Sequence, residues 1–276
     1  MGARIEPTAQ TGTALATITD RYLTRDDRLI ASLLQPYFVD HRIPGANAGS
    51  AIPDYVDATA NPARLSDDEN CAAIGLRTLS AGSTASVGYH SAIDHDYYDF
   101  DNAITSSYRS ASLGFVPDDT DCTVVVAVRP STMDTNVWIG EDAASSGERF
   151  QLYNTANGTV SANTINTGAD QIDTATGFVA ADTLKIIWFS YDHSSKAVAI
   201  GSGASVTPSV TGTFSGNLMR AGSGFALGSA NGAQPASGRL YRSWVLNKPY
   251  DQMTDELGND VFALALAALQ RRLGLS

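Results

Sequence analysis

Short runs of strand-forming residues, separated by turn residues, occupy the chain from about residue 89 to residue 252, and they constrain its fold more than any other feature. Residues 122–129, CTVVVAVR, are nearly all apolar and β-branched, which predicts a strand in the middle of a sandwich. Asn157-Gly158 lies between two such runs and predicts a hairpin, because both residue types tolerate positive φ. A second hairpin is predicted with its turn at residues 192–195.

Two further strands show alternating patterns that predict which residues share a face. The run YYDFD places Tyr98 and Phe100 on one face, opposite Tyr97, Asp99 and Asp101. The run GRLYRSWVLN is predicted to place Leu240, Arg242, Trp244 and Leu246 on one face, opposite Tyr241, Ser243, Val245 and Asn247. Such alternation is typical of strands that cover a core.

One helix is predicted near each end of the chain. Thr24 is expected to cap the first, with Asp27 at the capping-box spacing and Pro36 after the helix end. Its apolar face, packed on the same chain or on a neighbouring subunit, would hold Leu29, Ile30, Leu33 and Leu34. The second helix is predicted to begin at Asn259 and to stop at Gly274, with Val261, Phe262, Leu266 and Leu269 on one face and Arg271 and Arg272 in its last turn.

The order of these elements predicts an all-β fold, an antiparallel jelly-roll sandwich with a short N-terminal helical arm and a C-terminal helix. Residues 1–35 are expected to form an arm for attachment or oligomerisation. Residues 36–88 are expected to be irregular, since four prolines there disfavour long helices and central strands. Residues 89–276 would form the sandwich with its C-terminal helix.

The charge of the chain excludes some classes of partner. It has 18 basic and 29 acidic residues and a formal net charge of −11, so we expect neither nucleic acid nor an anionic membrane as a partner. The first residues lack the apolar segment of a secretion signal, and no apolar run approaches the roughly 18 residues of a membrane helix. We therefore expect a protein made in the cytoplasm without a signal peptide.

The chain contains two cysteines, Cys71 and Cys122, and neither belongs to a CxxC motif. Two free, buried thiols are favoured over a single disulfide, and a zinc site is not indicated.

A series of motifs resembles the concanavalin A-like lectin/glucanase superfamily in its laminin-G-like form. The motifs are YYDFDN, DCTVVVAVRP, LKIIWFSYDHSSKAVAIGSG, GFALGSANG, SGRLYRSWVLNKPYD and a closing helix that ends in RRLGL. The match covers roughly residues 90–276 and departs from the family pattern in the return strand KAVAIGSG. The resemblance implies a concanavalin A-like jelly roll, a fold of carbohydrate-binding modules, adhesive modules and glycosidases. Similar domains also occur as appendages of phage and phage-like particles.

Glycosidase chemistry is not indicated by the acidic residues. The reaction needs two carboxylates that flank the scissile bond. The family's laminarinase-like branch supplies them from an E-x-D-x-E strand, and the five glutamates of this chain do not form that spacing. Neither a nucleophile elbow nor a Walker A motif is present.

The acidic stretch HSAIDHDYYDFDN is the strongest candidate for a metal site. Calcium takes oxygen ligands, and Asp94 and Asp96, in the loop before the YYDFD strand, are the candidate ligands. The fifth position of the stretch DHDYYDFDN is Tyr98, so it departs from the pattern of a calcium-binding loop. No other cofactor is expected.

Four aromatic residues are candidates for stacking on sugar rings: Tyr97, Tyr108, Trp138 and Tyr153. The alternative for each is core packing, which is favoured for Trp188 and Trp244 because they lie in apolar strands.

Two hypotheses follow for the function. The first is a non-enzymatic structural and adhesion protein of a phage-like particle, such as a head decoration, spike or tail fibre, which assembles as a homo-oligomer with other particle subunits and binds cell-surface polysaccharide through rim loops. The second is a stand-alone lectin or a glycan-degrading enzyme. We expect the first, with no catalytic residues and a location on the virion or particle surface.

Overall fold

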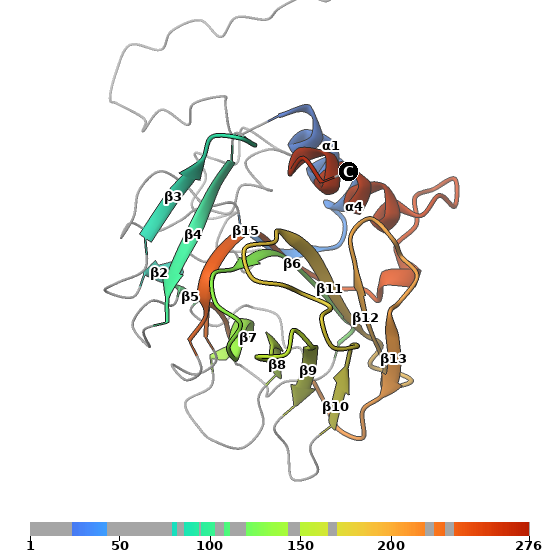
Figure 1. Cartoon of the computed structure of the whole chain (residues 1–276). Coiled ribbons are helices and arrows are strands. Elements are labelled where there is room, and N and C mark those ends of the chain that lie inside the picture. Colours follow the sequence, from blue (N-terminus) through green and yellow to red (C-terminus); the bar gives the residue numbers. More distant parts are fainter. Residues whose placement is uncertain are drawn as a thin grey trace, which may run out of the picture.

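Two antiparallel sheets packed face to face, with two helices on the outside of one of them, make up the architecture (Figure 1). The computed structural model describes residues 24–42, 79–81, 86–93, 95–102, 108–110, 120–142, 150–164, 170–218, 224–229 and 235–275. The sandwich predicted from the sequence is confirmed, as are a helix before it and a helix after it.

The first sheet has the order β13 (Val210–Thr213), β12 (Ala197–Ser202), β11 (Lys185–Tyr191), β6 (Cys122–Pro130), β15 (Ser237–Leu246), β4 (His95–Asp101), β3 (Ser86–His90), and β1 (Phe38–Arg42) also pairs with β15. The second has the order β10 (Asp170–Asp173), β9 (Val160–Thr164), β8 (Phe150–Asn154), β7 (Asn136–Asp142), β14 (Gly224–Leu227), β5 (Tyr108–Ser110), β2 (Leu79–Ala81). β1 and β2 lie within the segment expected to be irregular, and β3 crosses the expected boundary at residue 88.

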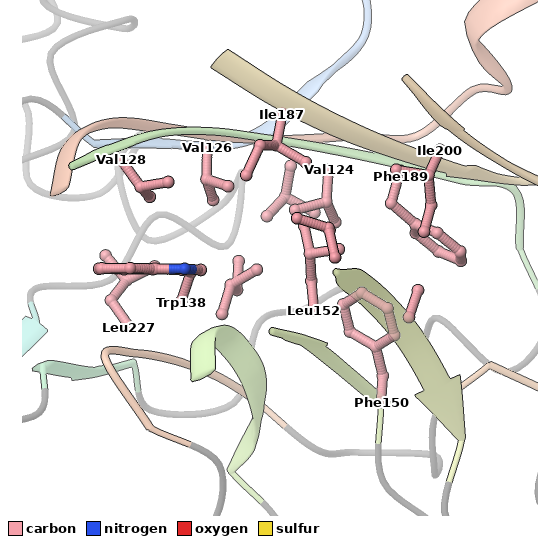
Figure 2. Packing of buried hydrophobic residues seen from close by; sticks show 14 of the residues in the cluster. Val124, Val126, Val128, Trp138, Phe150, Leu152, Ile187, Phe189, Ile200 and Leu227 are labelled. Atoms are coloured by element: carbon pink, nitrogen blue, oxygen red, sulfur yellow. The ribbon is translucent and has the colours of Figure 1, made fainter. Parts of the chain in front are cut away.

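β6 lies in the middle of the first sheet and is buried on both faces. Val124, Val126 and Val128 point towards the second sheet, where Phe150 and Leu152 of β8 meet them (Figure 2). Val125 and Ala127, whose side chains point the other way, face the helices. A strand covered on both sides needs apolar residues at every position, which explains the nearly unbroken apolar run.

The two helices form a layer on the far side of the first sheet. α1 (Arg25–Leu34) begins with the predicted capping box between Thr24 and Asp27. Its Ile30 and Leu34 are fully buried with residues of α4 (Val261–Arg272), while Leu29 is 40% exposed. The apolar face of α1 therefore packs on its own chain, and it is narrower than the sequence predicted.

The cap of α4 is Asp260, one residue later than predicted. The Oδ1 atom of Asp260 accepts a hydrogen bond from the backbone N–H of Ala263 at 2.9 Å. The Asn259 side chain instead donates from Nδ2 to Asp255 Oδ2 at 2.7 Å. Gly274 follows the helix with φ +64°, which fits its predicted role as the stop.

A bulge in β15 reverses the predicted alternation of that strand. Leu240 pairs with Val128 and Arg242 with Ala127, so Tyr241 is an extra residue in the ladder. As a result Leu240 faces the second sheet, whereas Trp244 faces the helices. The prediction that both share one face was wrong, because it assumed an uninterrupted strand.

Buried charges join α1 to the rest of the fold. Arg242 of β15 donates from Nη2 to Asp27 Oδ1 at 2.6 Å, and Arg272 of α4 donates from Nε to Asp27 Oδ2 at 3.1 Å. Arg242 Nη2 also lies 2.9 Å from His95 Nε2. Burial alone would raise the pKa of Asp27, but the two guanidinium groups outweigh it and hold that pKa well below its usual value.

Several sequence-based expectations fall on residues outside the described ranges. Residues 1–23, the greater part of the expected arm, lie there, and so does Cys71. Cys122 is a buried free thiol whose pKa is raised, first by burial and then by the nearby Asp121 carboxylate. Neither of the two described α-helices is long and apolar enough to span a membrane.

Candidate functional site

Trp138 does not offer a ring face to a ligand. The residue is fully buried between the sheets, where Figure 2 shows it beneath Val126 and Val128. Its Nε1 donates a hydrogen bond to Asn154 Oδ1 at 2.8 Å. A shift in the β7–β8 register between Val137 and Ile139 accompanies this inward position. Trp138 is thus a core residue, and its prediction as a sugar-stacking residue was wrong.

Tyr97 is also largely unavailable for stacking. It is 9% exposed on the helix side of the first sheet. The Arg239 guanidinium lies over its ring at 4.4 Å from the centroid, and the Tyr241 ring lies 5.5 Å away. Contacts within the protein therefore occupy this ring, and the structure does not favour it as a ligand platform.

The remaining metal and aromatic candidates are only partly described. Asp94 lies outside the described residues, and of Asp96 and Tyr108 only the backbone is described, in β4 and β5 respectively. In the described part of the chain no three His, Cys, Asp or Glu residues converge on a common point. The calcium site at Asp94 and Asp96 therefore stays a prediction.

Tyr153 lies on the outer face of the second sheet, within a group of polar side chains. Its neighbours in β8, Leu152 and Asn154, are buried, whereas Tyr153 itself is half-buried. Side chains of the same phase on β8, β9 and β10 form what we call the polar face: Gln151, Tyr153, Ser161, Asn163, Gln171 and Asp173.

The registers of three strands arrange the polar face in two rows. Gln151 pairs with Asn163, which pairs with Gln171. In the second row, Tyr153 pairs with Ser161 and Ser161 pairs with Asp173. Directly opposed residues have Cβ atoms about 5 Å apart, so the six side chains are close enough to contact one ligand.

Exposure rises across the polar face from β8 to β10. Gln151 is 2% exposed and Ser161 1%, whereas Gln171 and Asp173 on the edge strand are exposed. The edge strand therefore presents the part of the polar face that is most open to solvent.

Hydrogen bonds order the side chains at the exposed edge. Gln171 Nε2 donates to both carboxylate oxygens of Asp173, at 2.8 and 3.0 Å. Ser161 Oγ donates to Asp173 Oδ1 at 2.5 Å, and Tyr153 Oη donates to Gln171 Oε1 at 3.4 Å. Burial raises the pKa of the Tyr153 phenol; a hydrogen bond with Ser161 lowers it in part, and the Asp173 charge raises it further. The phenol is thus held as a neutral donor.

Two polar atoms at the buried side of the polar face have no hydrogen-bond partner. They are Nε2 of Gln151 and Oδ1 of Asn163, and both are shielded from solvent. A buried donor or acceptor without a partner costs about 1–3 kcal/mol, so such atoms are rare unless a ligand or water completes them. A free donor and a free acceptor therefore lie on directly opposed residues.

The sequence contained a signal for this face that the prediction did not use. In FQLYN and VSANT, the apolar residues Phe150, Leu152, Val160 and Ala162 alternate with polar ones. Alternation identifies the outward residues of each strand, but only the pairing of the three strands brings them together.

A second candidate is a pocket of about 140 Å³ on the helix side of the first sheet. Small residues of β12 and β13 line it, together with Tyr250 and the carboxylates of Asp192 and Asp251. The Tyr250 ring packs on Trp188 with centroids 4.8 Å apart. An aromatic ring beside carboxylates is compatible with a polyhydroxylated or a cationic ligand, so the pocket is an alternative to the polar face.

The sequence matches no protein-family model and no curated protein. Its fold resembles domain 4 of AbnA, an extracellular arabinanase of Geobacillus stearothermophilus solved with arabinotriose. The two are 17% identical with a TM-score of 0.51, and the match covers 67% of this chain and 82% of that domain.

Two toxin domains also share the fold. One is the ligand-binding domain of botulinum neurotoxin serotype D, solved with N-acetylneuraminic acid, with 6% identity, a TM-score of 0.58 and coverage of 88% of this chain and 53% of the toxin domain. The other is the binding domain of Paraclostridial mosquitocidal protein 1, with 9% identity, a TM-score of 0.57 and coverage of 84% and 52%. This chain thus spans about half of each, and at such identity these likenesses show the fold alone.

Proposed function

We propose that this chain is a non-enzymatic carbohydrate-binding module that holds a glycan on the polar face. The observation that carries the proposal is the free donor on Gln151 opposite the free acceptor on Asn163, beside the half-buried ring of Tyr153. Sugars present hydroxyl groups that donate and accept, and apolar ring faces that pack on aromatic rings. The fold supports the proposal, since the arabinanase domain and the neurotoxin domain were both solved with sugars.

A binding role fits the polar face better than hydrolysis does. Glycoside hydrolysis requires a pair of carboxyl groups on either side of the bond. Among the six residues of the polar face, Asp173 alone carries a carboxylate, and hydrogen bonds from Gln171 and Ser161 engage it.

The test is binding to a panel of polysaccharides, measured on a glycan array and by calorimetry. Tyr153→Ala is expected to weaken binding by about tenfold or more, the effect of losing about 1.4 kcal/mol of ring contact. Tyr250→Ala is the matched control, because it removes a ring of the same size from the second candidate pocket. Loss of binding in Tyr250→Ala alone would move the site to that pocket, and release of reducing sugar would contradict the non-enzymatic role.

The role in a phage-like particle is a further part of the proposal, and it rests on the sequence resemblance alone. In this role the chain is a surface component that assembles as a homo-oligomer and displays its polar face towards cell-surface polysaccharide. The mass of the native assembly tests it: a closed oligomer is expected that dissociates when residues 1–23 are deleted, a change that leaves α1 and Asp27 in place. A monomer would contradict the role.

A further inference from the structure

We infer that the polar face selects uncharged sugar units and rejects sugars that carry a carboxylate. The inference rests on the proposed function, because it names the class of glycan that the same site takes. It depends on two features of the face: the kind of hydrogen-bonding group that is left without a partner, and a fixed negative charge.

The unpaired atoms call for a group that both donates and accepts. Gln151 Nε2 is a donor and Asn163 Oδ1 is an acceptor, and the two residues are direct partners across β8 and β9. Both atoms are shielded from solvent, so a sugar reaches them only by displacing what covers them; one hydroxyl group, or two on neighbouring sugar carbons, then satisfies both atoms. A carboxylate only accepts hydrogen bonds. It would therefore accept one from Gln151 and leave the Asn163 oxygen facing the lone pairs of the carboxylate oxygens.

The charge of the polar face acts in the same direction. Asp173 lies at the exposed end of the second row, two residues along β10 from Gln171. Three hydrogen bonds hold its carboxylate: two from Gln171 at 2.8 and 3.0 Å and one from Ser161 at 2.5 Å. Because the charge is held in place, an anionic ligand on this face meets it at short range.

The surroundings add no opposing charge within the described residues of the face. Asp173 is the one ionised side chain among the six, and the whole chain has a formal net charge of −11. Approach of an anionic glycan is therefore disfavoured at long range as well as in contact.

The fold does not decide this preference by itself. The neurotoxin domain was solved with N-acetylneuraminic acid, a sugar acid, whereas the arabinanase domain was solved with arabinotriose, a neutral sugar. The same architecture therefore accommodates both classes of ligand, and the side chains of the site must select between them.

The experiment compares neutral glycans with related glycans that carry a carboxylate. The probes are lactose against sialyllactose and methyl-esterified against de-esterified polygalacturonate, with binding measured by array and calorimetry at low and high salt. The wild-type chain is expected to bind the neutral member of a pair at least about tenfold more tightly, and added salt should narrow the gap.

Variants of Asp173 identify the cause. Asp173→Asn keeps the shape of the side chain and is expected to lower the ratio of neutral-glycan to acidic-glycan affinity by about threefold or more. Asp173→Lys should lower this affinity ratio further. Asp182→Asn, an exposed carboxylate on the loop before β11, is the control and should leave the ratio unchanged. Thermal melting of each variant shows whether it is folded.

The outcomes separate the inference from the function on which it rests. If no glycan of either kind binds, the proposed function is wrong. If acidic members bind as tightly as neutral ones or more tightly, carbohydrate binding stands and the inferred selectivity is overturned. If Asp173→Asn is folded and its ratio of neutral-glycan to acidic-glycan affinity is unchanged, the inference is also overturned, because the selectivity then has another origin.

Discussion

Asp27 has two structural roles at once, because it completes the cap of α1 and forms ion pairs with two buried guanidinium groups. Asp27→Asn keeps the shape of the side chain but leaves the charges of Arg242 and Arg272 without a carboxylate. We expect it to lower the free energy of unfolding by about 3–5 kcal/mol, the usual cost of breaking a buried ion pair. Urea denaturation measures this loss.

Asp26→Asn is the matched control for this prediction. Asp26 pairs with Arg271 at 2.9 Å, but both side chains are partly exposed to water. Exposed pairs contribute about 0–1 kcal/mol, so the control should lose no more than that. Equal losses in the two variants would contradict the special role of Asp27.

Trp138 is expected to contribute to stability and not to ligand affinity. In Trp138→Phe the ring of Trp138 shrinks and the Oδ1 atom of Asn154 loses its donor. A buried acceptor left without a partner costs about 1–3 kcal/mol, and the smaller ring adds a packing loss. Thermal unfolding measures the loss, and calorimetry checks that glycan affinity is unchanged. If Trp138→Phe binds glycan more weakly but is as stable as the wild-type chain, Trp138 contributes to ligand binding after all.

At the scale of elements, the contact between β12 and β11 depends on a glycine. A Cβ atom at Gly201 would overlap the indole ring of Trp188, which packs on Tyr250. Gly201→Ala is therefore expected to cost about 1–3 kcal/mol and to shift the tryptophan fluorescence spectrum, because Trp188 must move.

Gly177→Ala provides the comparison for that variant. Gly177 has φ +75°, yet a Cβ atom there would meet nothing within 4 Å. It should cost about 1 kcal/mol from backbone strain alone, with an unchanged fluorescence spectrum. A spectral shift in both variants would show that the effect does not arise from contact with Trp188.

The docking of α1 is expected to weaken in acid. The pKa of Asp27 is lowered in the folded state, so its contribution is present above the unfolded value of about 3.9 and is lost as the pH falls through the lower folded value. The urea concentration at the unfolding midpoint of the wild-type chain should therefore decrease as the pH drops below about 4. The difference between the urea midpoints of the wild-type chain and Asp27→Asn should shrink over the same pH range. A constant difference would exclude Asp27 as the cause of the loss of stability in acid.

The sequence predicts single elements well and relations between elements poorly. The buried run of β6 and the capping box of α1 depend on neighbouring residues, so local patterns predicted both. The bulge at Tyr241 and the inward turn of Trp138 depend on partner strands, which no local pattern records. The polar face is a stronger case, because Gln151 and Asn163 become neighbours only through the register of β8 with β9.

At the scale of the whole molecule, the excess of acidic residues should govern solubility. The sequence has a pI of about 4.6, so the net charge that keeps chains apart vanishes near that pH. We expect solubility, measured by turbidity against pH, to pass through a minimum close to pH 4.6 and to recover above pH 6. A minimum far from this value would indicate that exposed apolar surface, and not charge, limits solubility.

The central position of β15 has a consequence for how the chain is made. β4, β1 and β6 all pair with β15, although β1 precedes it by about two hundred residues. A ribosome adds roughly 5–20 residues per second, so β1 spends about ten seconds or more without its partner. Until residues 237–246 emerge, the first sheet lacks the strand that joins its two halves. Newly made chains therefore pass through a period in which exposed strand edges are open to chaperones and to one another.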